Sequence, residues 1–162
     1  MRSIATAALL SLTAMGAGAA GIVNVTFVDP DKFYDAANSQ RELEGNLKTI
    51  EQHLKNLGQR HLADGQVLNI SVLDIDLAGY MKPLYGSARE VRVAKGAADW
   101  PRFTVRYTLE VNGAPIKSGE EVIADMNYGR HGQIAIYSSR DPLRLEKQML
   151  DNWFEVRFRR ED

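Results

Sequence analysis

The stretch that decides the fold is Leu68-Asn69-Ile70-Ser71-Val72-Leu73-Asp74-Ile75-Asp76-Leu77-Ala78-Gly79. Apolar and polar residues alternate up to Val72, which is typical of a β-strand with one buried face. After Val72 the apolar side chains change face, and Asp74 and Asp76 take the opposite one. A slip of one residue moves every side chain across a sheet, so the pattern predicts a β-bulge or sharp twist near Val72 and Leu73. Apolar residues on both faces favour a central strand.

The segments before this stretch predict a strand, a helix and a crossover. Residues 22–28 alternate as a strand, and Ser39 with Glu42 forms a capping box at the start of a helix. The apolar stripe of that helix consists of Leu43, Leu47, Ile50, Leu54 and Leu57. The helix is expected to end near Leu62. A right-handed crossover would then make the strands at 22–28 and 66–77 parallel.

The segments after it predict a hairpin. Residues 79–87 contain Pro83 and Gly86 and indicate a mobile loop, and residues 90–94 indicate a short strand. Phe103 to Val111 alternates throughout, and Asn112-Gly113 is a strong two-residue hairpin signal. The return strand is expected over roughly residues 116–126.

The end of the chain predicts a second helix. Residues 133–137 indicate a brief strand, and Asp141-Pro142 suits the start of a helix. Its apolar face is wide and is expected to be buried: Leu143, Leu145, Met149, Leu150, Trp153, Phe154 and Val156. The charged residues 157–162 are expected to fray. The order of elements predicts an α+β fold, a single mixed and mostly antiparallel sheet with two helices packed on one face.

Residues 1–20 are expected to be a signal peptide. Arg2 precedes an apolar run from Ile4 to Met15, and Ala17-Gly18-Ala19 supplies the small residues that a signal peptidase requires. The apolar run is short for a bilayer span, which favours cleavage after Ala19 or Ala20 over the alternative of an N-terminal membrane anchor. Residues 21–162 then have the length of a single domain, and we expect the mature protein in the periplasm.

Charge and cysteine content exclude several classes of partner. The sequence has 20 basic and 21 acidic residues, and removal of Arg2 leaves a net charge of −2. This balance gives no electrostatic reason to bind nucleic acid or to insert into an anionic membrane. There is no cysteine, so the chain forms no disulfide and carries no lipid on an N-terminal cysteine. No cofactor is expected.

Six segments together resemble a known family. They are Val25-Thr26-Phe27-Val28-Asp29-Pro30, Leu73-Asp74-Ile75-Asp76-Leu77-Ala78-Gly79, Ala98-Asp99-Trp100-Pro101-Arg102, Ser118-Gly119-Glu120-Glu121, Asp125-Met126-Asn127-Tyr128 and Glu146-Lys147-Gln148-Met149-Leu150-Asp151-Asn152-Trp153-Phe154. Their order and spacing are similar to those of the bacterial exported family catalogued as domain of unknown function 3016. The resemblance covers nearly the whole mature chain. It implies an exported envelope protein of Gram-negative bacteria and assigns no catalytic residue.

Asp74 and Asp76 are the first candidates for a functional site. Two positions apart on a strand, their carboxylates lie on one face about 7 Å apart. They suit ion pairs with at least one of Arg102 and Arg106, which lie four positions apart on the polar face of another strand. Alternatively they hold a hard cation such as Ca²⁺ with loop oxygens, or divide acid and base roles. We expect the ion pairs and no metal.

The aromatic and histidine residues are weaker candidates. Trp100 and Tyr128 lie at strand ends beside loops, where they suit either core packing or the wall of a binding groove. The three histidines, His53, His61 and His131, are too scattered to indicate a zinc site. His61 falls in the last turn of the first helix, where its cationic form would suit the helix C-terminus.

Two functions of different class follow from these residues. The first is a non-enzymatic periplasmic domain that binds an envelope protein or a small ligand. The alternative is a metal-dependent periplasmic hydrolase that uses Asp74 and Asp76. Calorimetry with Ca²⁺, Mg²⁺ and Zn²⁺ separates the two. The oligomeric state cannot be predicted from the sequence.

Overall fold

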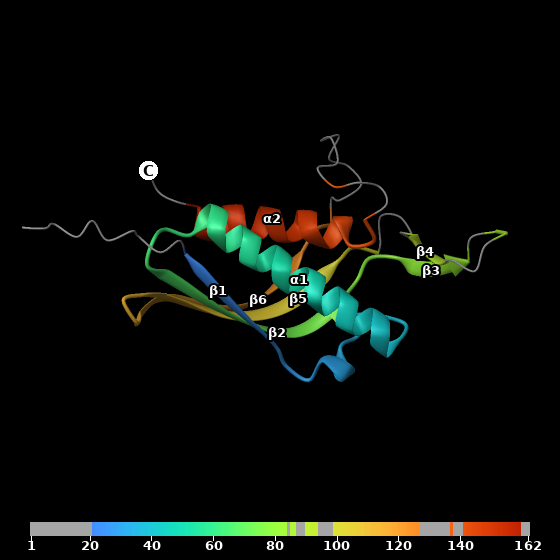
Figure 1. Ribbon diagram of the computed structural model, residues 1–162, viewed down its shortest axis with the longest axis horizontal. Coiled ribbons are helices and arrows are strands. Elements are labelled where there is room, and N and C mark those ends of the chain that lie inside the picture. The colour runs from blue at the N-terminus through green and yellow to red at the C-terminus, as the bar shows by residue number, and fades with distance from the viewer. Residues whose placement is uncertain are drawn as a thin grey trace, which may run out of the picture.

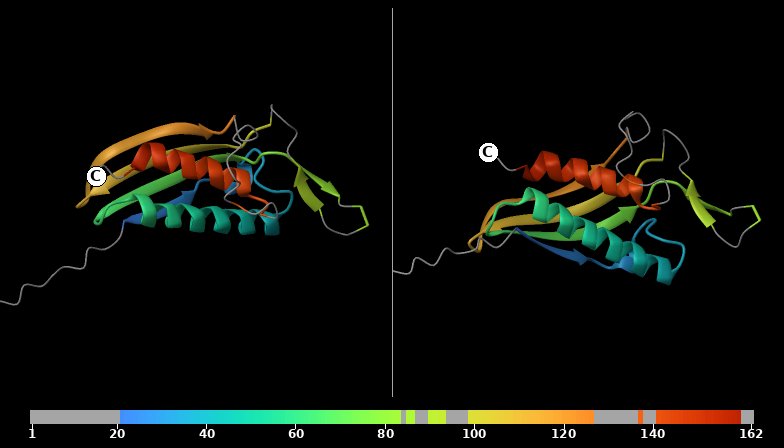
Figure 2. Two further views of the ribbon diagram at one scale, coloured as in Figure 1. Left: turned by 90° about the horizontal axis from the view of Figure 1, so that it is seen from above. Right: turned by 45° about the horizontal axis from the view of Figure 1, so that its top comes forward.

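A four-stranded sheet carries two helices on one of its faces (Figures 1 and 2). The computed structural model describes residues 21–83, 85–86, 90–93, 99–126, 137 and 141–159. The elements in chain order are β1 (Ile22–Phe27), the 3₁₀ turn η1 (Pro30–Lys32), α1 (Gln40–His61), β2 (Gln66–Asp76), β3 (Tyr80–Pro83), β4 (Glu90–Val93), β5 (Arg102–Val111), β6 (Ala114–Ala124) and α2 (Arg144–Phe158). The protein therefore has the predicted α+β architecture. Within the described residues, no helix is long and apolar enough to cross a membrane.

The sheet has the strand order β1-β2-β5-β6, with β1 and β6 at its edges. β1 and β2 are parallel, which confirms the predicted crossover through α1. β2 pairs antiparallel with β5, and β5 pairs antiparallel with β6. The turn between β5 and β6 consists of Asn112 and Gly113, which both have positive φ angles, as a two-residue hairpin of type I′ requires.

The predicted bulge in β2 is confirmed. The register with β5 shifts between Val72, which lies opposite Val105, and Asp74, which lies opposite Thr104. The extra residue is Leu73. Because of it, Val72 and Ile75 are both fully buried even though they are three positions apart. The bulge therefore places Asp74 on the sheet face away from the helices.

The helix α1 packs closely against the edge strand β1. Ser39 accepts a hydrogen bond from the backbone N–H of Glu42, and Glu42 reaches back to the N–H of Asn38, one residue before the predicted partner. The apolar stripe is buried at four of its five positions, and Leu47 packs against the core while partly exposed. Gly58 faces Val23 so closely that a Cβ there would meet the valine at 2.1 Å.

The helix α2 supplies the aromatic part of the core, but two details differ from the prediction. Trp153 and Phe154 are buried as expected, with ring contacts to Tyr107 and to each other. Val156 was expected in the buried face, yet its side chain is 79% exposed. Phe158 was expected to fray, yet it lies inside the helix and is only 5% exposed, because its ring packs edge-to-face against Trp153.

The prediction of a loop at residues 79–87 was wrong for part of that segment. Residues 80–83 form β3, which pairs with β4 as a separate two-stranded sheet beside the main one (Figure 1). The Arg92 guanidinium ties this pair to the body, since Nη1 donates to the carbonyl of Gly79 at 3.2 Å and to Asp35 at 3.3 Å. The strand predicted at residues 133–137 lies outside the described residues, apart from Tyr137.

Candidate functional site

Asp76 and Arg102 form the ion pair that their cross-strand positions predict. They lie directly opposite each other on β2 and β5. Both Nε and Nη2 of Arg102 donate to Oδ2 of Asp76, with 3.0 Å for the Nε contact. The hydrogen bond and the charge of Asp76 raise the pKa of the arginine. The Asp76 side chain is only 15% exposed, and that of Arg102 is 49% exposed. One carboxylate oxygen of Asp76 accepts both hydrogen bonds from the guanidinium.

Asp74 takes a different partner. Its Oδ1 accepts a hydrogen bond of 2.8 Å from the backbone N–H of Tyr34 and so fastens the chain after η1 to the sheet. The two carboxylates share a hollow of about 280 Å³ with four neighbours: Tyr34, Arg102, Thr104 and Val122. Among the described residues, no group of three or more His, Asp or Glu side chains is placed to hold a metal ion. The local chemistry of the hollow is that of paired and hydrogen-bonded carboxylates.

The other predicted site residues do not join this hollow. Arg106 lies opposite Ser71 and pairs instead with Glu120 of β6, at 2.9 Å from Nε to Oε2. The expected cluster with at least one of the two arginines is therefore formed by Arg102 alone, because Arg106 lies four positions further along β5, opposite Ser71. Trp100 is half-buried in the segment before β5. Tyr128 lies outside the described residues.

A buried polar cluster, which the sequence did not indicate, joins α1 to α2. His53 is 8% exposed, and its Nε2 lies 3.0 Å from Oδ1 of Asp151. The hydroxyl of Tyr137 donates to Oδ2 of Asp151 at 2.6 Å. Burial and this hydrogen bond raise the pKa of Tyr137, which keeps its hydroxyl a donor. Residues 53 and 151 are 98 positions apart, so no local signal connects them.

Opposing effects act on the Asp151 carboxylate. Burial by itself raises its pKa, but the hydrogen bonds from His53 and Tyr137 outweigh burial. The charges of His53 and Arg60 act in the same direction, and the net result is a lowered pKa. The cluster of His53, Tyr137 and Asp151 thus holds the two helices together through one ionised aspartate.

His61 was expected to favour its cationic form. Its pKa is instead lowered because of burial and the charge of Arg60.

Glu146 is a second buried acid that the sequence did not indicate. It lies in the first turn of α2, is 1% exposed, and accepts a hydrogen bond of 2.9 Å from the backbone N–H of Ala78 at the end of β2. Its other carboxylate oxygen is buried and has no hydrogen-bond partner among the residues that the structure describes. Burial raises the pKa of Glu146, against the smaller effect of the Ala78 bond. Glu146 thus binds the backbone just beyond the end of β2, where the chain continues into β3.

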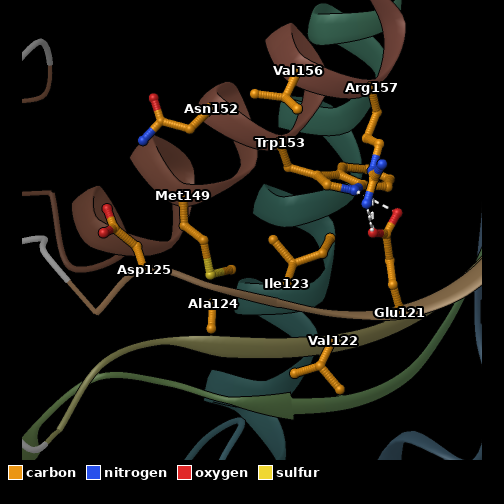
Figure 3. Close-up of a pocket in the computed structure, with 10 residues that line it drawn as sticks. All are labelled: Glu121, Val122, Ile123, Ala124, Asp125, Met149, Asn152, Trp153, Val156 and Arg157. Carbon is orange, nitrogen blue, oxygen red and sulfur yellow. Dashed lines mark hydrogen bonds and ion pairs between the residues drawn. The ribbon is translucent and has the colours of Figure 1, made fainter.

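A groove runs between the edge strand β6 and α2 (Figure 3). It encloses about 280 Å³, and we call it the β6/α2 groove. It is lined by residues 121–125 of β6 and its end, and by Met149, Asn152, Trp153, Val156 and Arg157 of α2. Figure 3 shows Met149 and Trp153 extending from the helix toward the strand, whereas Val122 points to the opposite side of the sheet.

A fixed polar bridge closes one side of this groove. Glu121 accepts hydrogen bonds from Nε1 of Trp153 at 3.1 Å and from Nη2 of Arg157 at 2.6 Å. The hydrogen bond and the charge of Glu121 raise the pKa of Arg157. The side chains of the bridge satisfy one another, which leaves the exposed side chain of Val156 as the main apolar surface that a ligand can cover.

Exposed apolar side chains lie along β6 and on α2, with Val156 on the helix side of the sheet and Val122 on the opposite side (Figure 3). Val156 is 79% exposed, and on or just after β6 the exposed fractions are 58% for Ile116, 62% for Val122 and 64% for Met126. Scattered exposed apolar residues are ordinary, but several along one unpaired strand and its neighbouring helix mark an interaction surface. This surface could not be predicted from the sequence, because Val156 has the same helical spacing as the buried residues of α2.

The comparisons with known proteins give one match. Neither the curated proteins nor the solved structures provide a match to this chain. A family model described as "Protein of unknown function (DUF3016)" matches residues 21–156, which is most of the chain and includes α1, all the strands named above and α2 up to Val156. The protein therefore belongs to the DUF3016 family.

Proposed function

We propose that this protein is an exported, non-enzymatic binding domain of the bacterial envelope, and that it binds a partner protein along β6 and α2. The observation that carries the proposal is the set of exposed apolar side chains along the edge strand β6 and on α2, of which Val156 in the β6/α2 groove is the most exposed. A protein partner that covers such side chains gains hydrophobic free energy, about 1.5–3 kcal/mol for each large one that becomes fully buried.

Export is supported by the sequence of residues 1–20. A basic residue, an apolar run and a small-residue motif follow one another in the order that signal peptidase substrates have. The intact mass of protein recovered from the periplasm is expected to correspond to a chain that starts at Ala20 or Gly21. Recovery of the chain with residues 1–19 still attached, in the membrane fraction, contradicts export of a free domain.

The binding surface is tested by photo-crosslinking in cells that export the protein. A photoreactive residue at Val156 is expected to give one defined protein adduct. The matched control is Val28, an exposed valine just beyond β1 at the opposite edge of the sheet, which is 42% exposed and is expected to give no adduct.

The partner identified from the adduct is then tested with purified proteins. It is expected to bind the wild type and Val28→Glu equally, and to bind Val156→Glu about tenfold more weakly or worse, because a charge replaces a buried apolar contact. Equal adducts at both positions, or an unchanged affinity of Val156→Glu, contradict the proposal.

A further inference from the structure

The direction of the main-chain groups in β6 follows from two hydrogen bonds on the other side of the sheet. The N–H of Asp35 donates to the carbonyl of Ile75 at 3.0 Å, and the N–H of Leu77 donates to the carbonyl of Asp35 at 2.9 Å. Ile75 and Leu77 therefore direct their main-chain groups away from β5. Since these groups alternate along a strand, those of Asp74 and Asp76 point toward β5.

The same alternation continues across β5. Thr104 lies opposite Asp74, so its main-chain groups face β2, and those of Phe103 and Val105 face β6. Ile123 lies opposite Phe103, and Glu121 lies opposite Val105. The amide and carbonyl groups of Glu121 and Ile123 therefore point back to β5.

The residues between them must point outward. Glu120, Val122 and Ala124 direct their amide and carbonyl groups off the edge of the sheet. β6 is the last strand in the sheet order, and within the described part of the chain no other strand pairs with it there. These three residues present alternating donors and acceptors at the spacing of an extended backbone.

Devices that normally protect a sheet edge lie only at one end of β6. Pro115, the register shift opposite Leu109 and Glu110, and Lys117 all fall within the first four residues of the strand or opposite them. Proline, bulges and lysine are the usual means of blocking unwanted strand pairing. From Ser118 to Ala124 the edge carries none of them, and this is the half that borders the β6/α2 groove.

We propose that residues 118–124 of β6 bind an extended segment of the partner polypeptide as an additional strand, whose alternate side chains enter the β6/α2 groove. This inference rests on the proposed function and specifies the partner's chemistry. Strand addition satisfies the outward main-chain groups, and pockets for alternate side chains give it specificity. In the groove the partner's side chains meet Val156, the most exposed apolar residue of its lining, so an apolar side chain is favoured there.

Charge favours a basic segment over a second copy of this chain. The nine residues 118–126 contain Glu120, Glu121 and Asp125 and no lysine or arginine. Antiparallel pairing of two such strands brings like charges together, which is unfavourable. Side chains that do not enter the groove lie on the face of Glu120, where a lysine or arginine would share the carboxylate that also pairs with Arg106.

The test uses a short synthetic peptide of alternating lysine and valine, with a peptide of alternating glutamate and valine of the same length as control. The lysine peptide is expected to bind the mature protein, and the glutamate peptide about tenfold more weakly or worse. Two N-methylated lysine peptides separate strand addition from simple groove contact. Methylation of the amides that face β6 is expected to weaken binding about tenfold or more, whereas methylation of the alternate amides leaves it nearly unchanged.

Variants of the protein test the same edge. Val122→Pro removes one outward N–H without removing a hydrogen bond to β5, and is expected to weaken peptide binding more than Val122→Ala, which shortens the side chain but keeps that N–H. Equal binding of both N-methylated peptides, or no binding of the lysine peptide up to about 1 mM, overturns strand addition. A dimer that the peptide dissociates, seen by sedimentation, overturns it in favour of a second copy. The proposed function is judged separately, by the partner's affinity for Val156→Glu.

Discussion

Asp151 on α2 joins the two helices by accepting a hydrogen bond from His53 on α1, with 3.0 Å between Oδ1 and Nε2. Because hydrogen bonds from His53 and Tyr137 outweigh burial, the folded-state pKa of Asp151 lies below its ordinary value of about 3.9. The folded chain thus holds fewer protons than the unfolded chain near that pH. The resulting stability is fully present above about pH 4 and is lost as the pH falls through the folded-state pKa.

Asp151→Asn is therefore expected to lower the free energy of unfolding at pH 7 by about 1.5–3 kcal/mol, the range for a hydrogen bond to a charged group. The difference from the wild type is expected to shrink as the pH falls below about 4. Urea unfolding across this range measures it, with the exposed Asp64→Asn as control. A difference that stays constant down to the lowest pH contradicts the role of the ionised carboxylate.

Glu146 is expected to show the opposite pH dependence. Burial raises its folded-state pKa above the ordinary value of about 4.3, so here the folded chain holds more protons. Its effect on stability becomes unfavourable as the pH rises from about 4.3 to the folded-state pKa. Glu146→Gln keeps an acceptor for the N–H of Ala78 and is expected to gain stability relative to the wild type over that rise. If Glu146→Gln is instead less stable than the wild type at neutral pH, the negative charge of Glu146 is required beside Arg92.

Asp76 and Arg102 are expected to be energetically coupled, whereas Asp76 and Arg106 are not. Arg102 is the cross-strand partner of Asp76, but Arg106 pairs with Glu120. In a double-mutant cycle, Asp76→Asn with Arg102→Gln is expected to show a coupling of up to about 1 kcal/mol, and Asp76→Asn with Arg106→Gln to be additive. Ca²⁺ is expected to leave the unfolding midpoint unchanged. A stabilisation by Ca²⁺ that Asp74→Asn abolishes would identify a metal site.

Two glycines of α1 are expected to respond oppositely to alanine. A Cβ at Gly58 meets Cγ2 of the buried Val23 at 2.1 Å, and one at Gly45 meets nothing within 4 Å. Gly58→Ala is expected to destabilise by about 1–3 kcal/mol through overpacking between helix and strand. Gly45→Ala is expected to stabilise by about 0.5–1 kcal/mol, because alanine has the higher helix propensity. Equal changes in melting temperature for the two variants would show that the close contact between Gly58 and Val23 does not make a larger side chain unfavourable.

The elements of the fold could be predicted where the signal is local. The change of apolar face at Val72 predicted the bulge, Ser39 with Glu42 predicted the start of α1, and Asn112-Gly113 predicted the hairpin. Residues 80–83 were predicted as a loop because Gly79, Pro83 and Gly86 are turn residues. The strand there depends on its pairing with β4, which Arg92 holds to the body through contacts distant in sequence.

The sites were less predictable for the same reason. The pairing of Asp76 with Arg102 was expected because both lie on polar strand faces, but the register was needed to show that Arg106 lies opposite Ser71 and takes Glu120 as its partner instead. The contact of His53 with Asp151 depends on how two helices pack, which neither segment specifies alone. Val156 has the spacing of a buried residue, and only its position at the outer side of α2 exposes it.

Amide hydrogen exchange of the free mature protein is the most direct test of the binding surface. We predict alternation along β6, with slow exchange at Glu121 and Ile123, whose amides bond to β5, and fast exchange at Glu120, Val122 and Ala124. Such a pattern means that the edge beside the β6/α2 groove is open to a partner strand. Slow exchange at all five positions would mean that the edge is already covered, and would contradict the binding surface proposed for it.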